Sequence, residues 1–373
     1  MSWTGAHALV DALLRHGIDR TFCVPGESYL SVLDVLHDRP EIDVVTARHE
    51  AGAGFMAVSD AKLTGQPAVA FVSRGPGATN ASIALHTAEQ DAVPLILFIG
   101  QVGRATLPRG GFQQVDYRQT FADIAKGVWE VTDAASLAEV VARAFHTAAT
   151  GTPGPAVVGL PEDMLRDPAP HIARPPFPVV RPRPSGAEVA AVAGRLTEAE
   201  RPLLIAGGEL DHPAGRAALA ACADAWGLPV ATTFKRQDLI DNGREHFAGH
   251  LGFNIPQEQV ALLSEADLIL AVGTRLSDVS TQGYRLPRAP EPDQPVIQVH
   301  SDPAQIGRVT RVAQGVAAAS EGFLSALTDA APVGQAARLG DWRRRLHGYV
   351  ARWAQRQIAP ADDGVDFGEV VMA

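Results

Sequence analysis

Residues 70–80 read AFVSRGPGATN, in which an apolar run is followed by Gly75, Pro76 and Gly77 before helical spacing begins. We interpret this stretch as a strand that passes through a Gly-Pro-Gly turn into a helix. Such a turn lets backbone N–H groups approach a ligand without interference from a Cβ atom. Taken alone, the pattern also fits an ordinary strand–helix turn, and Asn80 stands where a dinucleotide-binding fingerprint needs its last glycine.

The same alternation of apolar runs and helical spacing occupies the whole first half of the chain. Strands that are apolar throughout and are separated by helices indicate a parallel sheet covered on both faces. We therefore expect a doubly wound α/β domain over residues 1–165. Its expected strands are 21–24, 42–47, 68–73, 95–100 and 156–160, and its expected helices are 4–16, 29–37, 50–63, 78–89 and 137–149.

A proline-rich stretch over residues 166–185 follows, and prolines at this density favour an extended connector. Beyond it we expect a second doubly wound parallel-sheet domain over 186–332 and a helical C-terminal tail over 333–373. In the tail, Asp366 followed by Glu369 predicts the start of another helix. The second domain has expected strands at 202–206, 229–232, 268–272 and 296–299, and expected helices at 188–196 and 214–226.

The composition excludes several classes of protein. A net charge of −10 argues against nucleic acid or an anionic membrane as partner. The two cysteines, Cys23 and Cys222, lie far apart and indicate neither a disulfide framework nor a zinc site. The N-terminus lacks the pattern of a signal peptide, and no apolar run approaches the roughly 20 residues of a membrane helix. We expect a cytoplasmic protein with no metal ligands of its own.

Residues 45–57 read VTARHEAGAGFMA, so that an apolar strand leads to Glu50 at the start of a helix rich in small residues. Glu50 therefore falls at the carboxyl end of a strand, where open parallel sheets bind ligands. The alternative interpretation is that Glu50 only stabilises the N-terminus of its own helix. A third stretch, GFQQVD at 111–116, belongs to a long loop, and long loops in compact domains are commonly functional.

Together and in this order, these stretches resemble the pyrimidine-binding domain of acetolactate synthase and its thiamine-diphosphate-dependent relatives. The resemblance extends over nearly the whole chain and includes the central domain of that family. The motifs that carry it are VPGE at 24–27, RHEAGA at 48–53, GPGATN at 75–80, EQDAVPL at 89–95, FQQVD at 112–116, GPAVV at 154–158, LPED at 160–163, AVGTRLS at 271–277 and SDPAQIG at 301–307.

The resemblance implies an enzyme, a transferase or lyase that decarboxylates pyruvate or another 2-keto acid and carries out carboligation, as in branched-chain amino acid biosynthesis. In that family the glutamate matching Glu50 hydrogen-bonds N1′ of the aminopyrimidine ring of thiamine diphosphate and so activates the cofactor. Gln113 is expected to face the substrate, which makes Glu50 and Gln113 the expected catalytic residues. The residues expected to bind the cofactor are Pro25, Gly26, Glu50, Gly75, Pro76, Gly77 and Asn80.

The motif with which this family holds the diphosphate through Mg²⁺, Gly-Asp-Gly followed by Asn, is missing. Gly340-Asp341 continues with Trp342, and the last Asn is Asn254. We therefore expect only the pyrimidine half of the site here, with Mg²⁺ held in an absent diphosphate-binding domain. The chain is expected to be inactive alone and to form a homodimer or tetramer. Because the last expected helix breaks off, a truncated product is favoured over one half of a split enzyme.

Departures from the family pattern at Glu27, Gln114 and residues 276–278 leave the substrate and a bound flavin open. A second hypothesis is a non-catalytic module that binds FAD or a nucleotide through Gly207-Gly208 and residues 273–275. A third is a lyase of the oxalyl-CoA decarboxylase or benzoylformate decarboxylase type.

Overall fold

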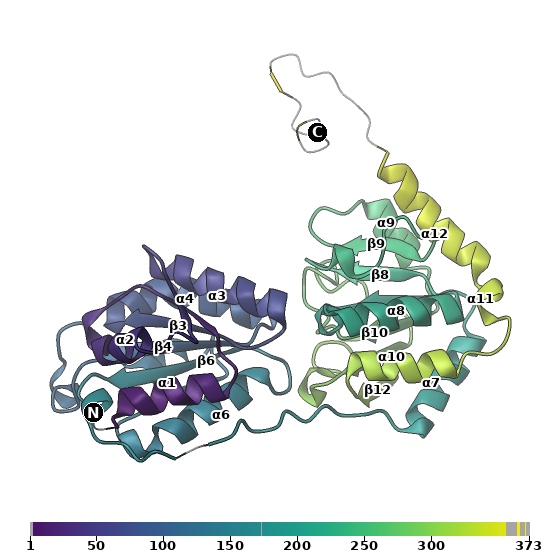
Figure 1. Cartoon of the computed structure of the whole chain (residues 1–373). Coiled ribbons are helices and arrows are strands. Elements are labelled where there is room, and N and C mark those ends of the chain that lie inside the picture. The colour runs from purple at the N-terminus through teal and green to yellow at the C-terminus, as the bar shows by residue number, and fades with distance from the viewer. Residues whose placement is uncertain (1–2, 173, 356–363, 366–369, 371–373) are drawn as a thin grey trace. The chain divides into compact units, whose positions relative to one another are not determined.

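The computed structural model describes residues 3–172, 174–355, 364–365 and 370. The chain divides into two compact units, Met1–Val180 and Arg181–Ala373, and each is described by itself (Figure 1). This division falls inside the proline-rich stretch, and the domain limits given above stay predictions. The helix expected from Asp366 and Glu369 lies outside the described residues.

The first unit contains a parallel sheet of six strands in the order β2-β1-β3-β4-β6-β5. Strands β4 and β6 are buried at every position, as is expected of parallel strands that have helices on both faces. The strands are β1 (Arg20–Cys23), β2 (Asp43–Thr46), β3 (Ala68–Ser73), β4 (Leu95–Gln101), β5 (Gly127–Glu130) and β6 (Pro155–Pro161).

Helices cover both faces of this sheet. One face packs against α1 (Gly5–Arg15), α2 (Leu30–His37) and α6 (Leu137–Ala149), and the other packs against α3 (Glu50–Thr64), α4 (Arg74–Asp91) and α5 (Tyr117–Phe121).

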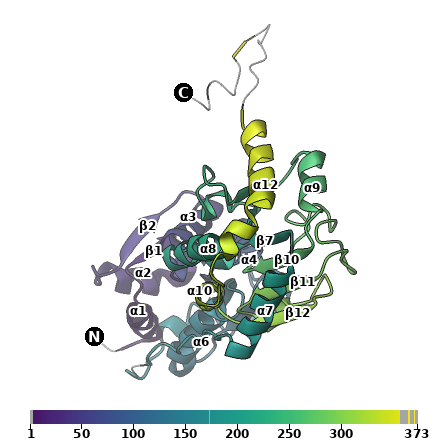
Figure 2. The same cartoon turned by 90° about the vertical axis from the view of Figure 1, so that its right-hand side faces the viewer.

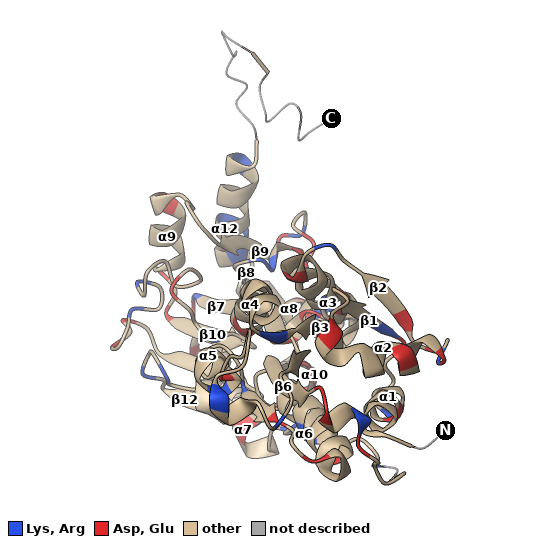
Figure 3. Cartoon of the chain, turned by 90° about the vertical axis from the view of Figure 1, so that its left-hand side faces the viewer, with Lys and Arg blue, Asp and Glu red and all other residues tan. Residues whose placement is uncertain are grey.

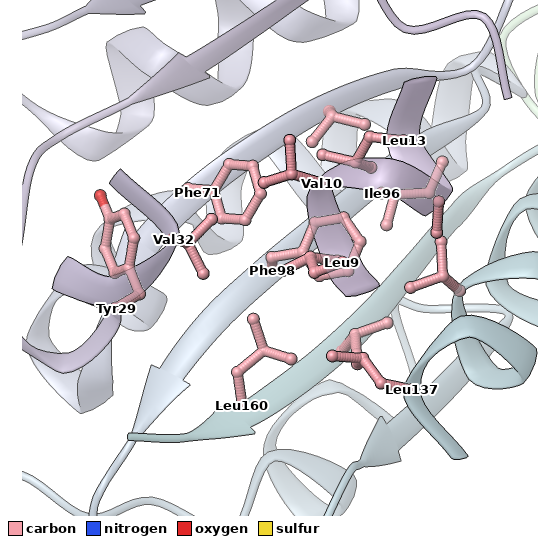
Figure 4. Close-up of a cluster of buried hydrophobic side chains, with 14 of the residues drawn as sticks. Leu9, Val10, Leu13, Tyr29, Val32, Phe71, Ile96, Phe98, Leu137 and Leu160 are labelled. Carbon is pink, nitrogen blue, oxygen red and sulfur yellow. The ribbon is translucent and has the colours of Figure 1, made fainter. Parts of the chain in front are cut away.

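Aromatic rings fill the core on the α1 side of the sheet (Figure 4). Phe71 and Phe98 stack with 5.0 Å between ring centroids, and Tyr29 stacks on Phe71 at 5.7 Å. Successive residues of a strand point to opposite faces, so the neighbours of Phe71 in β3, Ala70 and Val72, pack on the α3 side. The small side chains of β3 therefore lie on the face that carries the candidate site.

The second unit has the same architecture. Its six parallel strands follow the order β12-β11-β10-β7-β8-β9, namely β7 (Pro202–Ala206), β8 (Val230–Thr233), β9 (Phe247–Leu251), β10 (Leu268–Val272), β11 (Val296–His300) and β12 (Gln314–Ala317). One face packs against α7 (Gly186–Glu198), α8 (Pro213–Trp226) and α10 (Ser320–Asp329). The other packs against α9 (Gln257–Leu263) and α12 (Gly340–Trp353), which lie side by side in Figures 1 and 2, while the short helix α11 (Gln335–Arg338) precedes α12. Two parallel sheets with helices on both faces confirm the expected fold class.

Charged residues of both signs are interspersed over the elements of both units (Figure 3). Among the described residues, no helix is both long enough and apolar enough to cross a membrane.

The expected strands 68–73, 202–206 and 268–272 and the expected helix 137–149 match the observed bounds residue for residue. Several elements were not expected: β5, β9, β12, α5, α9 and α10. The edge strands β5 and β12 lack a continuous apolar run, because β5 is half-buried throughout and β12 has exposed residues at two of its four positions.

We predict that Trp342→Ala lowers the free energy of unfolding of the second unit by about 3–5 kcal/mol. Trp342 is 6% exposed in the α9/α12 core, and its Nε1 donates to the Pro202 carbonyl oxygen at 3.0 Å. Trp353 lies on the same helix but is 59% exposed, so Trp353→Ala should stay within about 0.5 kcal/mol of the wild type. Urea unfolding followed by circular dichroism measures both variants. Equal losses would show that Trp342 does not anchor α12.

Candidate cofactor-binding site

The first sheet has a topological switch point between β1 and β3. Strand β1 continues through α2 to β2 on one side, whereas β3 continues through α4 to β4 on the other. Open α/β sheets bind ligands outside the carboxyl ends of the strands at such a point. The motifs at 24–27 and 75–80 follow β1 and β3 directly, so both lie at this edge of the sheet.

Glu50 is the first residue of α3, and its side chain reaches across to α4. Asn80 Nδ2 donates to Glu50 Oε2 at 2.9 Å. The other oxygen, Oε1, faces Gly77, where a Cβ atom would lie 3.3 Å from it. Within the described part of the chain, no hydrogen bond is donated to Oε1. The half-buried carboxyl group is thus held at one oxygen and open at the other.

This geometry bears on the interpretation of Glu50 as a helix-capping residue. The side-chain cap of α3 comes from His49, whose Nδ1 accepts a hydrogen bond from the Ala51 N–H at 3.1 Å. The carboxylate of Glu50 instead bonds to a residue of a different helix. A favourable charge at the N-terminus of α3 remains, but it does not account for the direction of the side chain.

Gly26 lies where the loop after β1 touches the end of β3. A Cβ atom on Gly26 would lie 2.4 Å from Ser73 Cβ, so only glycine fits this approach. The hydroxyl groups of Ser28 and Ser73 are 2.7 Å apart and join the segment after β1 to the end of β3. Pro25 and Gly26 are therefore fixed against the residue that precedes α4.

Tyr29 holds the same loop from the side of the hydrophobic core. This residue was not identified as part of the site from the sequence. Its ring stacks on Phe71 in the core, and its hydroxyl donates to the Val24 carbonyl oxygen. Burial raises the pKa of Tyr29, and the negative charge of Glu50 acts in the same direction. Tyr29 therefore remains a neutral donor near Glu50.

The Gly-Pro-Gly segment is not a turn, which corrects the expectation from the sequence. Helix α4 begins at Arg74, so Gly75, Pro76 and Gly77 form its first turn. Proline is tolerated there because the first N–H groups of a helix have no partner within the helix. The Gly75 N–H donates to the Gln113 carbonyl oxygen at 2.9 Å, and a Cβ on Gly75 would lie 2.7 Å from that oxygen.

Gln113 is thus brought to the start of α4 through its backbone, while its side chain is exposed. It adopts φ +63°, a region that residues other than glycine rarely occupy. Gln114 closes the loop, since its Oε1 accepts from the Gly111 N–H at 2.8 Å and its Nε2 donates to the Leu107 carbonyl oxygen at 2.7 Å. A carboxylate at 114 could not donate the second bond, so the loop as it stands uses both the oxygen and the nitrogen of the Gln114 amide.

Arg74 is a second residue that the sequence did not single out. Its side chain is 13% exposed and lies between two carboxylates, with Nη2 at 2.9 Å from Glu162 and Nη1 at 3.5 Å from Glu27. These contacts connect the start of α4 to the segments that follow β1 and β6. Arg74 also has φ +24°, and backbone strain of this kind clusters at functional sites.

The described residues contain no group of three or more His, Cys, Asp or Glu side chains that could hold a metal ion. The site therefore consists of one positioned carboxyl group, a neighbouring amide and glycine backbone. Such a set suits a flat heteroaromatic ligand whose ring nitrogen can exchange a hydrogen bond with Oε1 of Glu50.

Family models identify the class of protein that this fold and site define. Residues 3–120 match the thiamine pyrophosphate enzyme, N-terminal TPP binding domain, and residues 189–327 match the thiamine pyrophosphate enzyme, central domain. The chain belongs to the thiamine pyrophosphate enzyme family.

Similar proteins narrow this class to relatives of acetolactate synthase. The acetolactate synthase large subunit of Parasynechococcus marenigrum (strain WH8102) is 34% identical over 82% of this chain and 50% of its own length. That of Corynebacterium glutamicum is 31% identical over 94% of this chain and 56% of its own length. The sulfoacetaldehyde acetyltransferase of Rhodobacter capsulatus is 31% identical over 98% of this chain and 62% of its own length.

A solved structure shares the fold. It is of a protein from Mycobacterium smegmatis described as a thiamin diphosphate-dependent enzyme, with a TM-score of 0.78 and 24% identity over 90% of this chain and 64% of that chain. The present chain spans between 50% and 62% of the length of the three curated relatives.

We predict that Gly75→Ala lowers the free energy of unfolding by about 1–3 kcal/mol, because the new Cβ overlaps the backbone of Gln113. Gly52 is a matched control in the first turn of α3, where a Cβ would meet nothing within 4 Å. Gly52→Ala should raise stability by about 0.4–1 kcal/mol. The midpoints of urea unfolding measure the stability of the two variants. If Gly75→Ala is as stable as the wild type, the 111–115 loop does not pack against α4.

Proposed function

We propose that this chain provides the pyrimidine-binding and central domains of an acetolactate synthase-like enzyme that decarboxylates pyruvate or a related 2-keto acid and joins the remaining fragment to an acceptor carbonyl. The observation that carries the proposal is the Glu50 carboxyl group at the switch point of the first sheet. Asn80 holds one of its oxygens, and the other faces Gly77.

The residues at this edge fit the pyrimidine half of thiamine diphosphate. Glu50 offers one oxygen to a ring nitrogen, and Gly77 keeps the space beside that oxygen free of a side chain. The core directly behind Gly77 is apolar, since a Cβ atom on Gly77 would lie 3.5 Å from Cβ of the buried Val72. Expected contributions from Pro25 and Gly26 rest on their fixed position at the end of β3.

When bound, thiamine diphosphate supplies the electron sink for the loss of CO₂ from a 2-keto acid. Glu50 holds or releases a proton at Oε1, and Asn80 prevents the carboxyl group from turning away by bonding Oε2. Gln113 remains the proposed contact to the substrate, since its exposed side chain projects from a loop anchored at Gly75. Arg74 acts as a positioning residue that ties the loops around the site together.

We assign the diphosphate and its Mg²⁺ to a further domain, because this chain matches only 50% to 62% of the length of its three curated relatives. Multidentate contacts to diphosphate and metal supply much of the affinity for such a cofactor. The chain alone should therefore bind the cofactor weakly and be inactive. A homodimer or homotetramer completed by that domain is the proposed working form.

Sulfoacetaldehyde as substrate is a second candidate, because the acetyltransferase of Rhodobacter capsulatus matches 98% of this chain and the largest share of its own length among the three relatives above. A substrate panel that also contains oxalyl-CoA and benzoylformate separates these activities. We propose the cytoplasm as the location; Cys23 and Cys222 are free and buried, as is common in a reducing compartment.

We predict that Glu50→Gln weakens the binding of thiamine diphosphate to the purified chain by about 10-fold or more, since a hydrogen bond to a charged group contributes about 1.5–3 kcal/mol. Isothermal titration calorimetry at high protein concentration measures the affinities. Glu41→Gln is the control, because Glu41 is an exposed carboxylate paired with Arg39 before β2.

The same variants test activity after fusion to the C-terminal part of the Corynebacterium glutamicum acetolactate synthase large subunit. The wild-type fusion and its Glu41→Gln variant should form acetolactate from pyruvate, whereas Glu50→Gln should not. Turnover by the unfused chain would contradict the proposal that it is inactive alone. Equal affinity and turnover of Glu50→Gln and the wild type would contradict the role of Glu50.

A further inference from the structure

The second unit also has a switch point at the carboxyl edge of its sheet. Strand β7 continues through α8 to β8, whereas β10 leads to β11 on the opposite side. A flavin or another dinucleotide bound at such a point places its phosphates against free backbone N–H groups and needs the absence of negative charge there.

The side chain of Glu209 occupies this point. It follows β7 in the short 3-10 turn Gly208–Leu210 and is only 14% exposed. The Ser301 N–H, directly after β11, donates to both carboxylate oxygens at 3.1 and 3.2 Å, and the Ser301 hydroxyl donates to Oε1. The hydroxyl of Ser320, the first residue of α10, donates to Oε2 at 2.6 Å. The chain's own carboxylate thus takes the donors that an anion would use.

Three further backbone N–H groups at this edge are engaged within the unit itself. The Gly207 N–H donates to the Val272 carbonyl oxygen at 2.9 Å, and the Gly273 N–H donates to that of Val299 at 2.9 Å. The Glu209 N–H itself donates to the Gly273 carbonyl oxygen at 3.2 Å. None of these three groups is left for a phosphate.

The glycines that suggested a nucleotide site are explained by internal contacts. A Cβ on Gly207 would lie 2.4 Å from the Gly273 carbonyl oxygen, and a Cβ on Gly273 would lie 2.9 Å from Glu209 Cβ. A Cβ on Gly208 would lie 3.3 Å from Nε of Arg236, which pairs with Asp211 at 3.3 Å. The glycines make room for the two turns and for Glu209, and they do not require a ligand.

We infer that Glu209 fills the anion position of the second unit from within and thereby excludes the phosphates of FAD or of another dinucleotide. The residues present do not fit a flavin at this edge, which speaks against the hypothesis of a flavin- or nucleotide-binding module built on Gly207-Gly208 and residues 273–275. The inference is independent of the role of Glu50, because it concerns a different unit and a different edge.

The direct test is titration of the full chain with FAD and with ADP, followed by flavin fluorescence and by calorimetry. The expected result is no saturable binding of either compound. Stoichiometric binding of FAD or ADP by the wild-type chain would overturn the inference, whatever the variants show.

The second test removes the internal anion. Glu209→Ala leaves the Ser301 and Ser320 donors without a partner, so its urea midpoint should fall, and added pyrophosphate should restore part of the loss. We expect its affinity for pyrophosphate to exceed that of the wild type by about tenfold or more, taken from the midpoint shift relative to sodium chloride of equal ionic strength. Glu209→Gln is the matched control, because it keeps the volume of the side chain in place. Pyrophosphate should stabilise it no more than it stabilises the wild type.

If pyrophosphate raises the urea midpoints of Glu209→Ala, Glu209→Gln and the wild type equally, the assignment of an anion position is contradicted. If Glu209→Ala does not fold, the wild-type titrations with FAD and ADP still decide whether the edge is closed.

Discussion

The candidate site depends on how closely α3 and α4 pack. A Cβ on Gly54 of α3 would lie 2.5 Å from Ala84 Cβ of α4, so a larger side chain at 54 would force the helices apart. This approach lets Glu50, at the start of α3, reach Asn80 and face Gly77 in α4. Glycine within a helix costs about 1 kcal/mol relative to alanine, which the close packing must offset. The Glu50 carboxyl group can thus reach α4 because Gly54, where the two helices meet, has no side chain.

The two units use the same architecture in opposite ways. Both sheets are parallel and doubly wound, and both have a carboxylate beside a glycine at the switch point. In the first unit, Glu50 has one oxygen bonded to Asn80 and one oxygen open, which suits a ligand. In the second unit, both oxygens of Glu209 accept hydrogen bonds from Ser301 or Ser320. These donors are therefore not available to an anionic ligand. The fold alone therefore does not determine function, and the partners of each carboxylate do.

The sequence predicts the fold well where strands are buried on both faces. Short, continuous apolar runs such as 202–206 are typical of such strands. It fails at the edge strand β5, whose half-buried residues give no clear pattern. At the site, the motif residues could be chosen from the sequence, but their geometry could not. The contact between Gly75 and the carbonyl oxygen of Gln113 joins segments almost forty positions apart and leaves no local signal, and Gly-Pro-Gly resembles a turn although it begins a helix.

The proposed role of Glu50 is to share a proton with a pyrimidine ring nitrogen. It is tested most directly by ¹⁵N NMR of thiamine diphosphate labelled at N1′ and bound to the chain fused to a diphosphate-binding domain. The N1′ resonance should shift on binding to the wild type and should keep the position of the free cofactor when bound to Glu50→Gln. A bound cofactor whose N1′ resonance is the same in both proteins would contradict it.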